Sequence, residues 1–239
     1  MTDSDAALRS QVVAVAAQMH ANGLIHGRAG NLSVRLDDRR FLTTPAGIRK
    51  ASMNPDQLLI VDLDGNLLEG PPGYAPTSEL PMHLEAYRQR PDVKGVIHAH
   101  PTHCIALSLT ELTLEAPYIA EALVLLGPVP TAAYATPSST ENRDAIAGLI
   151  AGHDAIILAH HGSLTVGRNL EEAYERLEVL EHSAEILLLA SRLGPPRQIP
   201  PDEVEKLMKM RREMLRSGQE GGLAERISLQ IEEILKRLN

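Results

Sequence analysis

One segment, residues 77–103 (TSELPMHLEAYRQRPDVKGVIHAHPTH), constrains the fold more than any other part of the chain. It predicts a short amphipathic helix followed by a buried strand that ends in His98-Ala99-His100. Alternate side chains of a strand lie on the same face, so we expect His98 and His100 to point together. Two such imidazoles can share a divalent metal ion, but the pattern is equally compatible with one structural and one solvent-exposed histidine.

A third histidine favours the metal site. A second apolar strand, expected over residues 154–159, ends in His160-His161-Gly162. Three imidazoles with an open position are typical of catalytic zinc, and a nearby carboxylate, Glu79, can act as a fourth ligand or as a base. Imidazole also suits Mn²⁺, Co²⁺, Fe²⁺ or Ni²⁺, so zinc is only the first choice. Cys104 also follows the first strand, but its position there favours a small buried apolar residue over a further ligand.

Composition excludes several classes of partner. The chain has 239 residues and a net charge of −8, which argues against non-specific nucleic-acid binding. Aromatic residues make up only 3%, with no Trp, so few side chains could stack on bases. The single cysteine excludes an intrachain disulfide framework and fits a reducing compartment. The polar start and the absence of a long apolar run predict a cytoplasmic protein with no membrane partner.

The order of apolar segments predicts an α/β fold. Short strands with hairpin turns, such as Asp64-Gly65, alternate with helices at residues 5–22, 80–89 and 169–192. This pattern favours a mixed or antiparallel sheet layered by helices. We expect a catalytic domain over residues 1–193 and a C-terminal helical extension over 194–239. The extension carries helical stretches at 202–216 and 223–238, whose apolar stripes would pack on the body or on a neighbouring subunit; the first stripe comprises Leu207, Met210, Met214 and Leu215.

Five motifs then occur in order: G-x-x-G-N-x-S at Gly27–Ser33, T-P-x-G at Thr44–Gly47, T-S-E at Thr77–Glu79, H-x-H at His98–His100, and H-H-G at His160–Gly162. Together they resemble the class II aldolase/adducin family over roughly residues 8–193, closest to its fuculose-phosphate aldolase-like branch. The resemblance implies a three-layer α/β/α fold with a mostly antiparallel central sheet of about nine strands. It also implies a homotetramer with sites at subunit interfaces.

The resemblance assigns roles to individual residues. His98, His100 and His161 correspond to the metal ligands, since the family's third ligand immediately precedes the glycine; His160 would then lie on the opposite face of its strand. Glu79 corresponds to the catalytic carboxylate and a possible fourth ligand. Tyr118 corresponds to a proton donor that reaches the site from a neighbouring subunit. The substrate phosphate would be held by Gly30, Asn31, Gly47, Thr77 and Ser78.

The implied reaction is the reversible cleavage of a ketose 1-phosphate to dihydroxyacetone phosphate and an aldehyde through a metal-stabilised enediolate. Glu79, rather than an aspartate, favours aldolase over epimerase chemistry. Ala46 replaces a hydroxyl residue of the phosphate pocket, so whether the donor is phosphorylated stays open. Arg28 and Lys50 could compensate, although solvated surface charge is the expected role of each.

Pro137 replaces an aromatic residue of the aldehyde pocket, so the acceptor preference stays open. The alternatives are a decarboxylase or dehydratase of a sugar acid on the same metal site and, less favoured, a non-catalytic adducin-like scaffold. That scaffold branch lacks the histidines that this chain retains.

Overall fold

A central sheet organises the protein. The computed structural model describes residues 3–139 and 141–217. Within them, eight strands lie in the order β4-β3-β2-β1-β5-β8-β7-β6, where about nine were expected. Neighbours are antiparallel except for the parallel pair β6 and β7. The strands are β1 Asn31–Arg35, β2 Phe41–Thr43, β3 Leu59–Val61, β4 Leu67–Glu69, β5 Gly95–Ala99, β6 Thr131–Ala132, β7 Ala155–Leu158 and β8 Gly162–Gly167.

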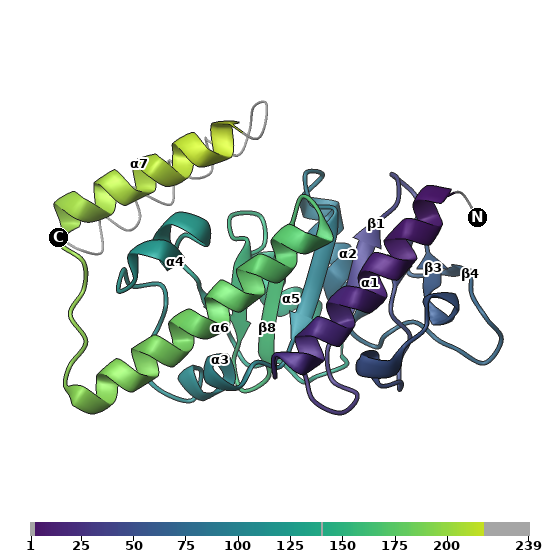
Figure 1. Ribbon diagram of the computed structural model, residues 1–239, viewed down its shortest axis with the longest axis horizontal. Coiled ribbons are helices and arrows are strands. Elements are labelled where there is room, and N and C mark those ends of the chain that lie inside the picture. Colours follow the sequence, from purple (N-terminus) through teal and green to yellow (C-terminus); the bar gives the residue numbers. More distant parts are fainter. Residues whose placement is uncertain (1–2, 140, 218–239) are drawn as a thin grey trace.

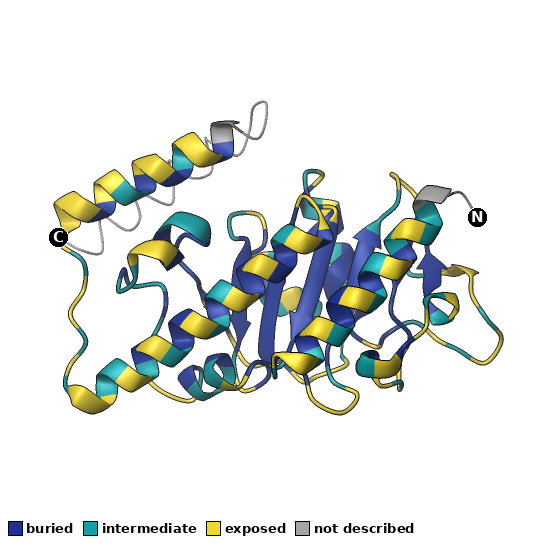
Figure 2. Ribbon diagram, in the orientation of Figure 1, coloured by how far each residue is buried: buried dark blue, intermediate teal, exposed yellow. Residues whose placement is uncertain are grey.

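Helices cover both faces of the sheet, which confirms the three-layer α/β/α architecture (Figure 1). Helices α1 (Asp3–Ala21) and α6 (Leu170–Leu193) pack on one face, and α2 (Leu80–Gln89) and α5 (Glu141–Ala147) pack on the other. The strands β1, β2, β3, β5, β7 and β8 are almost entirely buried, whereas the edge strand β4 is exposed and α1 and α6 show exposed outer faces (Figure 2). The remaining helices are α3 Thr102–Leu107, α4 Ala120–Leu125, α7 Pro201–Ser217 and two short 3-10 turns, Lys50–Ser52 and Pro55–Gln57.

Strand alternation decides which side chains face helix α2. In β5, Ile97 and Ala99 join the core beneath α1 and α6, whereas Val96 joins the core beneath α2. His98, two residues after Val96, therefore lies on the α2 side. Asn31 of β1 is the direct cross-strand partner of His98, so its side chain emerges on the same face. The sheet thus gathers polar residues under the N-terminal end of α2.

Local signals account for the main helix boundaries. Helix α1 ends before Gly23, whose φ of 71° is the left-handed conformation expected of a glycine after a helix. Helix α6 begins after Asn169, whose side chain accepts a 2.8 Å hydrogen bond from the backbone of Glu172. Helix α5 is short and spans Glu141–Ala147.

Helix α7 packs against the body of the molecule. Val204, Met208 and Leu215 are buried with Leu123 of α4. The expected apolar stripe is therefore only partly right: Leu207 and Leu215 contact this cluster, whereas Met210 and Met214 are 55% and 41% exposed. The second expected stretch, 223–238, lies outside the described residues, and the division at residue 194 stays a prediction. Among residues 3–139 and 141–217, no helix is both long and apolar enough to span a bilayer.

Candidate functional site

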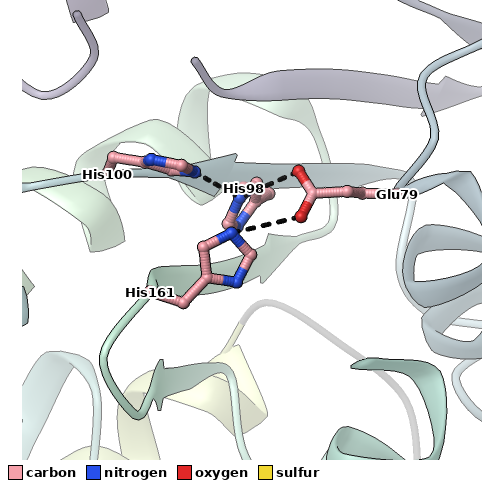
Figure 3. A group of neighbouring side chains, drawn as sticks. All are labelled: Glu79, His98, His100 and His161. Carbon is pink, nitrogen blue, oxygen red and sulfur yellow. Dashed lines mark hydrogen bonds and ion pairs between the residues drawn. The ribbon is translucent and has the colours of Figure 1, made fainter. Parts of the chain in front are cut away.

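Glu79, His98, His100 and His161 meet at one point (Figure 3). One oxygen or nitrogen from each lies within 4.8 Å of the others, and all but His100 are buried. Glu79 precedes the first residue of α2, and His98 lies near the end of β5. His100 follows β5 directly, and His161 lies in the turn between β7 and β8. Segments from both halves of the chain thus build the cluster. This agrees with the prediction that histidines following two buried strands meet at one site.

A tight turn brings His161 to the cluster. The His161 N–H donates a 3.0 Å hydrogen bond to the Leu158 carbonyl, and His160 adopts a φ of 60° within this turn. A Cβ atom on Gly162 would collide with the Ala99 carbonyl oxygen, so only glycine allows this close approach to β5. His160 is exposed and sits in the turn, so its expected place on the opposite face of the strand was wrong.

The proton positions around His98 indicate a cation at the centre. His98 Nδ1 lies 2.9 Å from the Ser163 carbonyl oxygen, which can only accept, so Nδ1 carries the hydrogen. In a neutral ring, His98 Nε2 then presents a lone pair. That atom lies 3.1 Å from Glu79 Oε2 and 2.9 Å from His100 Nε2. The ionised carboxylate oxygen cannot donate, so its close contact with His98 Nε2 needs a shared positive charge, either a proton on the imidazole or a metal ion.

The distances and protonation states fit a divalent metal. Tetrahedral ligands at about 2.1 Å from Zn²⁺ would be about 3.4 Å apart. The Nε2 atoms of His98 and His161 lie 3.1 and 3.2 Å from the Glu79 oxygens. Burial lowers the pKa of His100 to about 3, which keeps its ring neutral and able to donate a lone pair. Burial raises the pKa of Glu79, but the charge of a protonated His98 and hydrogen bonds from His161, His98 and Asn31 outweigh it. A metal ion held by the neutral imidazoles would favour the ionised carboxylate in the same way as that proton.

A buried chain of hydrogen bonds leads from the cluster into the core. Asn31 Nδ2 donates to Glu79 Oε2 at 2.9 Å, so Asn31 Oδ1 is the acceptor 2.6 Å from His83 Nε2. His83 then donates through Nε2 and accepts through Nδ1, 2.8 Å from Ser33 Oγ. Tyr87 Oη lies 2.9 Å beyond Ser33 Oγ. Every hydrogen can therefore point toward Glu79, and the chain fixes the orientation of that carboxylate.

Sequence reasoning missed this chain, although its signals were present. Glu79, His83 and Tyr87 follow the i, i+4, i+8 spacing of one helix face. Asn31 and Ser33 alternate on β1, and both emerge on the side of α2. Burial lowers the pKa of His83 to about 3, which keeps its ring neutral as the chain requires.

Three loops beside Glu79 carry the residues expected to hold a phosphate. Gly30 has a φ of 75°, and a Cβ there would press on the Ile25 side chain. Gly47 has a φ of 73°, and a Cβ there would meet open space. Thr77 donates its N–H to the Thr44 carbonyl at 3.3 Å, which joins the loop before Glu79 to the loop that contains Gly47. Ser78 is exposed, with Oγ 2.8 Å from Ser138 Oγ. The side chain of Asn31 is turned to Glu79 and His83 instead.

The remaining candidates lie apart from the four-residue cluster. Tyr118 packs, partly buried, against the apolar cluster that contains Leu114 and Leu126. Cys104 is buried and unbonded to another cysteine, as an apolar core residue would be. Arg28 is exposed as expected, but Lys50 is only 3% exposed, so its assignment to the solvated surface was wrong. Lys50 Nζ donates to the carbonyls of Arg28 and Ile48.

Comparison with known proteins agrees with this geometry. Residues 10–188 match the family described as the class II aldolase and adducin N-terminal domain. The chain is 31% identical to 5-deoxy-D-ribulose 1-phosphate aldolase of Bacillus thuringiensis serovar kurstaki, over 84% of this chain and 93% of the relative. It is 32% identical to 3-oxo-tetronate 4-phosphate decarboxylase of Escherichia coli K12, over 84% and 94%.

Solved structures show the same fold. A structure described as L-fuculose 1-phosphate aldolase superposes with a TM-score of 0.79 at 31% identity, covering 87% of this chain and 96% of that one. The family match extends over most of the chain, and the similar proteins of known activity cleave carbon–carbon bonds. The chain therefore belongs to the class II aldolase and adducin family and is an enzyme of its carbon–carbon lyase type.

Proposed function

We propose that the protein is a divalent-metal-dependent aldolase that reversibly cleaves a ketose 1-phosphate to dihydroxyacetone phosphate and an aldehyde. The observation that carries the proposal is the meeting of Glu79 with three imidazoles inside 4.8 Å. His98, His100 and His161 would hold the metal, with Zn²⁺ the first choice for three nitrogens and one carboxylate oxygen. Once bound, the cation would supply a Lewis acid for the negative charge that develops on the donor oxygens.

Glu79 is the proposed base. Its carboxylate is ionised and is held by Asn31 on one oxygen, so it can take a proton from the hydroxymethyl carbon of the donor. In the reverse direction it returns that proton to the same carbon. The three loops that contain Gly30, Gly47, Thr77 and Ser78 would hold the donor phosphate with backbone N–H and hydroxyl groups, assisted by Asn31.

Tyr118 is the proposed acid for the departing aldehyde oxygen. Its side chain packs, partly buried, against the apolar cluster around Leu114. In this proposal Tyr118 serves the site of a neighbouring subunit, within a homotetramer whose sites lie between subunits. A cytoplasmic location fits the unpaired, buried Cys104.

A decarboxylase is the second candidate, supported by the 32% identity to the Escherichia coli decarboxylase over 84% of this chain. Both reactions leave negative charge on a carbon next to a carbonyl group, so the same cation and base could serve either one. They differ in the leaving group, which is an aldehyde in one case and carbon dioxide in the other.

The deciding experiment follows proton exchange by NMR. Metal-loaded protein is mixed with dihydroxyacetone phosphate in heavy water, and we expect the signal of one hydroxymethyl proton to disappear stereospecifically. A parallel sample receives 3-oxo-tetronate 4-phosphate, and carbon dioxide release is measured. Exchange without decarboxylation supports the aldolase; decarboxylation without exchange assigns the protein to the second candidate.

His83 should act as a positioning residue for Glu79. In His83→Phe, Asn31 Oδ1 loses its donor and the amide is free to rotate away from Glu79. We expect kcat for proton exchange to fall about 10- to 100-fold, which is typical when a residue that orients a metal-site side chain is removed. KM for the donor should stay within about twofold. Steady-state exchange rates measured over a range of donor concentrations separate the two constants.

The matched control is His83→Gln, whose amide N–H can still donate to Asn31. It should recover a large part of kcat, and both variants should hold as much metal as the wild type. A loss of metal in both variants, or a rise in KM as large as the fall in kcat, would contradict a positioning role. Either result would show that His83 supports the fold of the whole site.

A further inference from the structure

Lys50 is a buried cation without an acidic partner. Its side chain is 3% exposed, and Nζ donates to the carbonyl oxygens of Arg28 at 3.0 Å and Ile48 at 3.1 Å. No carboxylate in residues 3–139 and 141–217 forms an ion pair with it. Burial lowers the pKa of its ammonium group, although the nearby charge of Glu79 opposes that shift. A buried charge is costly unless an opposite charge accompanies it, so this position calls for an anion.

The two carbonyls bonded to Lys50 belong to the loops that flank the proposed substrate pocket. Arg28 lies in the loop 27–31, and Ile48 directly follows the T-P-x-G turn at 44–47. Both loops contain glycines with positive φ beside open space, Gly27 at 58° and Gly47 at 73°. An ammonium group carries three hydrogens, and the two carbonyls account for two of them. Lys50 therefore holds the loops together and places one positive charge behind them.

A third loop, residues 75–79, is hydrogen-bonded to the turn at 44–47. Ala46 donates its N–H to the Ala75 carbonyl at 2.9 Å, and Thr77 donates to Thr44 at 3.3 Å. Residues 75–79 thus lie beside the turn that Lys50 supports, and Glu79 is close enough to affect the pKa of Lys50. The proposed anion site is therefore bordered by the turn that Lys50 supports and by the loop that carries Thr77 and Ser78.

We propose that Lys50 is a specificity-determining residue that supplies the counter-charge for a phosphate monoester on the substrate. This inference rests on the proposed function for the location of the substrate, but it concerns binding and not cleavage. Ala46 lacks the hydroxyl that the family resemblance places in the phosphate pocket. In this proposal the positive charge of Lys50 compensates for that missing hydroxyl. The inference predicts that the charge of Lys50 makes phosphorylated donors bind more tightly than their neutral analogues.

The test compares two ligands that differ only in the phosphate. Metal-loaded wild type and Lys50→Met are titrated with dihydroxyacetone phosphate and with dihydroxyacetone by calorimetry, and inorganic phosphate serves as a third probe. A hydrogen bond between charged groups corresponds to about a 10- to 150-fold change in affinity. We expect Lys50→Met to lose at least about tenfold for the two phosphate-bearing ligands and less than about twofold for dihydroxyacetone.

Two further variants control for charge and for folding. Lys94→Met removes one exposed positive charge just before β5, four residues or about 13 Å from His98 along an extended strand, and should bind all three ligands like wild type. Lys50→Gln removes the charge but keeps two amide donors, on a side chain one atom shorter, that can reach toward the loop carbonyls, so it should show the same selective loss as Lys50→Met. Thermal unfolding with and without inorganic phosphate checks that each variant is folded.

The outcomes separate this inference from the proposed function. Unchanged selectivity in both Lys50 variants, or an equal loss for phosphorylated and neutral ligands, would overturn the role of Lys50, whatever reaction the protein catalyses. Selective loss of phosphate binding would support it even for a protein that decarboxylates its substrate and never exchanges a proton of dihydroxyacetone phosphate. Tighter binding of a carboxylate probe such as glycolate than of phosphate would also overturn it, since the pocket would then select a different anion.

Discussion

Glu79→Gln should lower the rate of proton exchange at dihydroxyacetone phosphate by at least about 100-fold, the usual size of a general-base contribution. A glutamine keeps the shape of the side chain and can still accept the hydrogen bond from Asn31, but it cannot take up a proton at neutral pH. The three histidines are untouched, so bound metal should remain, measured by atomic absorption after gel filtration. Loss of exchange with retained metal would assign the base directly.

Glu85→Gln provides the matched control. Glu85 lies on α2, six residues after Glu79, and its partly buried carboxylate interacts with Gln89 and Arg88. The variant removes an identical charge from α2 and should exchange protons at the wild-type rate. If Glu79→Gln with full metal content kept an exchange rate within about tenfold of wild type, another group would have to be the base.

The periodicity of the sequence predicted the layers and most of the central cluster. His98 and His100 could be placed together because a strand repeats every two residues, and a second apolar strand ending in His160-His161 indicated a third imidazole. The choice of His161 over His160 came from the family resemblance. Short elements were harder to predict. Residues 120–125 form helix α4 and residues 131–132 form β6, and both elements are only a few residues long. Such short runs contain too few residues to reveal either the 3.6-residue repeat of a helix or the two-residue repeat of a strand.

Parts of the site depend on contacts that leave no pattern in the sequence. Lysine is rarely buried, so Lys50 was assigned to the surface; its partners are backbone carbonyls, which every residue has. His160 was placed on a strand that in fact ends at Leu158, because the left-handed turn conformation of a non-glycine residue is uncommon. In contrast, the His83 chain could have been found from the spacing of α2 and β1.

Asp154→Asn should destabilise the fold by about 3–5 kcal/mol, because it removes the shared partner of three buried arginines. Asp154 is 4% exposed, directly before β7, and its oxygens lie 3.0, 3.2 and 2.9 Å from the guanidinium nitrogens of Arg90, Arg176 and Arg211. Arg90 directly follows α2, Arg176 belongs to α6 and Arg211 belongs to α7. One carboxylate therefore connects both helical layers and the C-terminal helix. Urea unfolding at pH 7 measures the loss.

Asp144→Asn is the control for this substitution. Asp144 pairs with Arg143 at 2.7 Å, but its side chain is 63% exposed, and an ion pair in water contributes less than about 1 kcal/mol. A similar small effect of Asp154→Asn would mean that the arginines find other partners, for example Asp92 and Glu172, which already contact Arg90 and Arg176. In that case the Asp154 carboxylate would not be needed to hold the helical layers together.

The pH dependence provides an independent check. Although burial raises the pKa of Asp154, the charges of Arg176, Arg211 and Arg90 outweigh it, and the net pKa is well below that of the unfolded chain, which is about 3.9. The unfolded state therefore takes up a proton first, so the stability due to Asp154 is complete above about pH 5 and is lost as the pH falls through the low folded pKa. Asparagine does not titrate, so the difference in unfolding free energy between wild type and Asp154→Asn should shrink by about 1 kcal/mol between pH 7 and pH 3. A constant difference over that range would show that the carboxylate is not held by the arginines in solution.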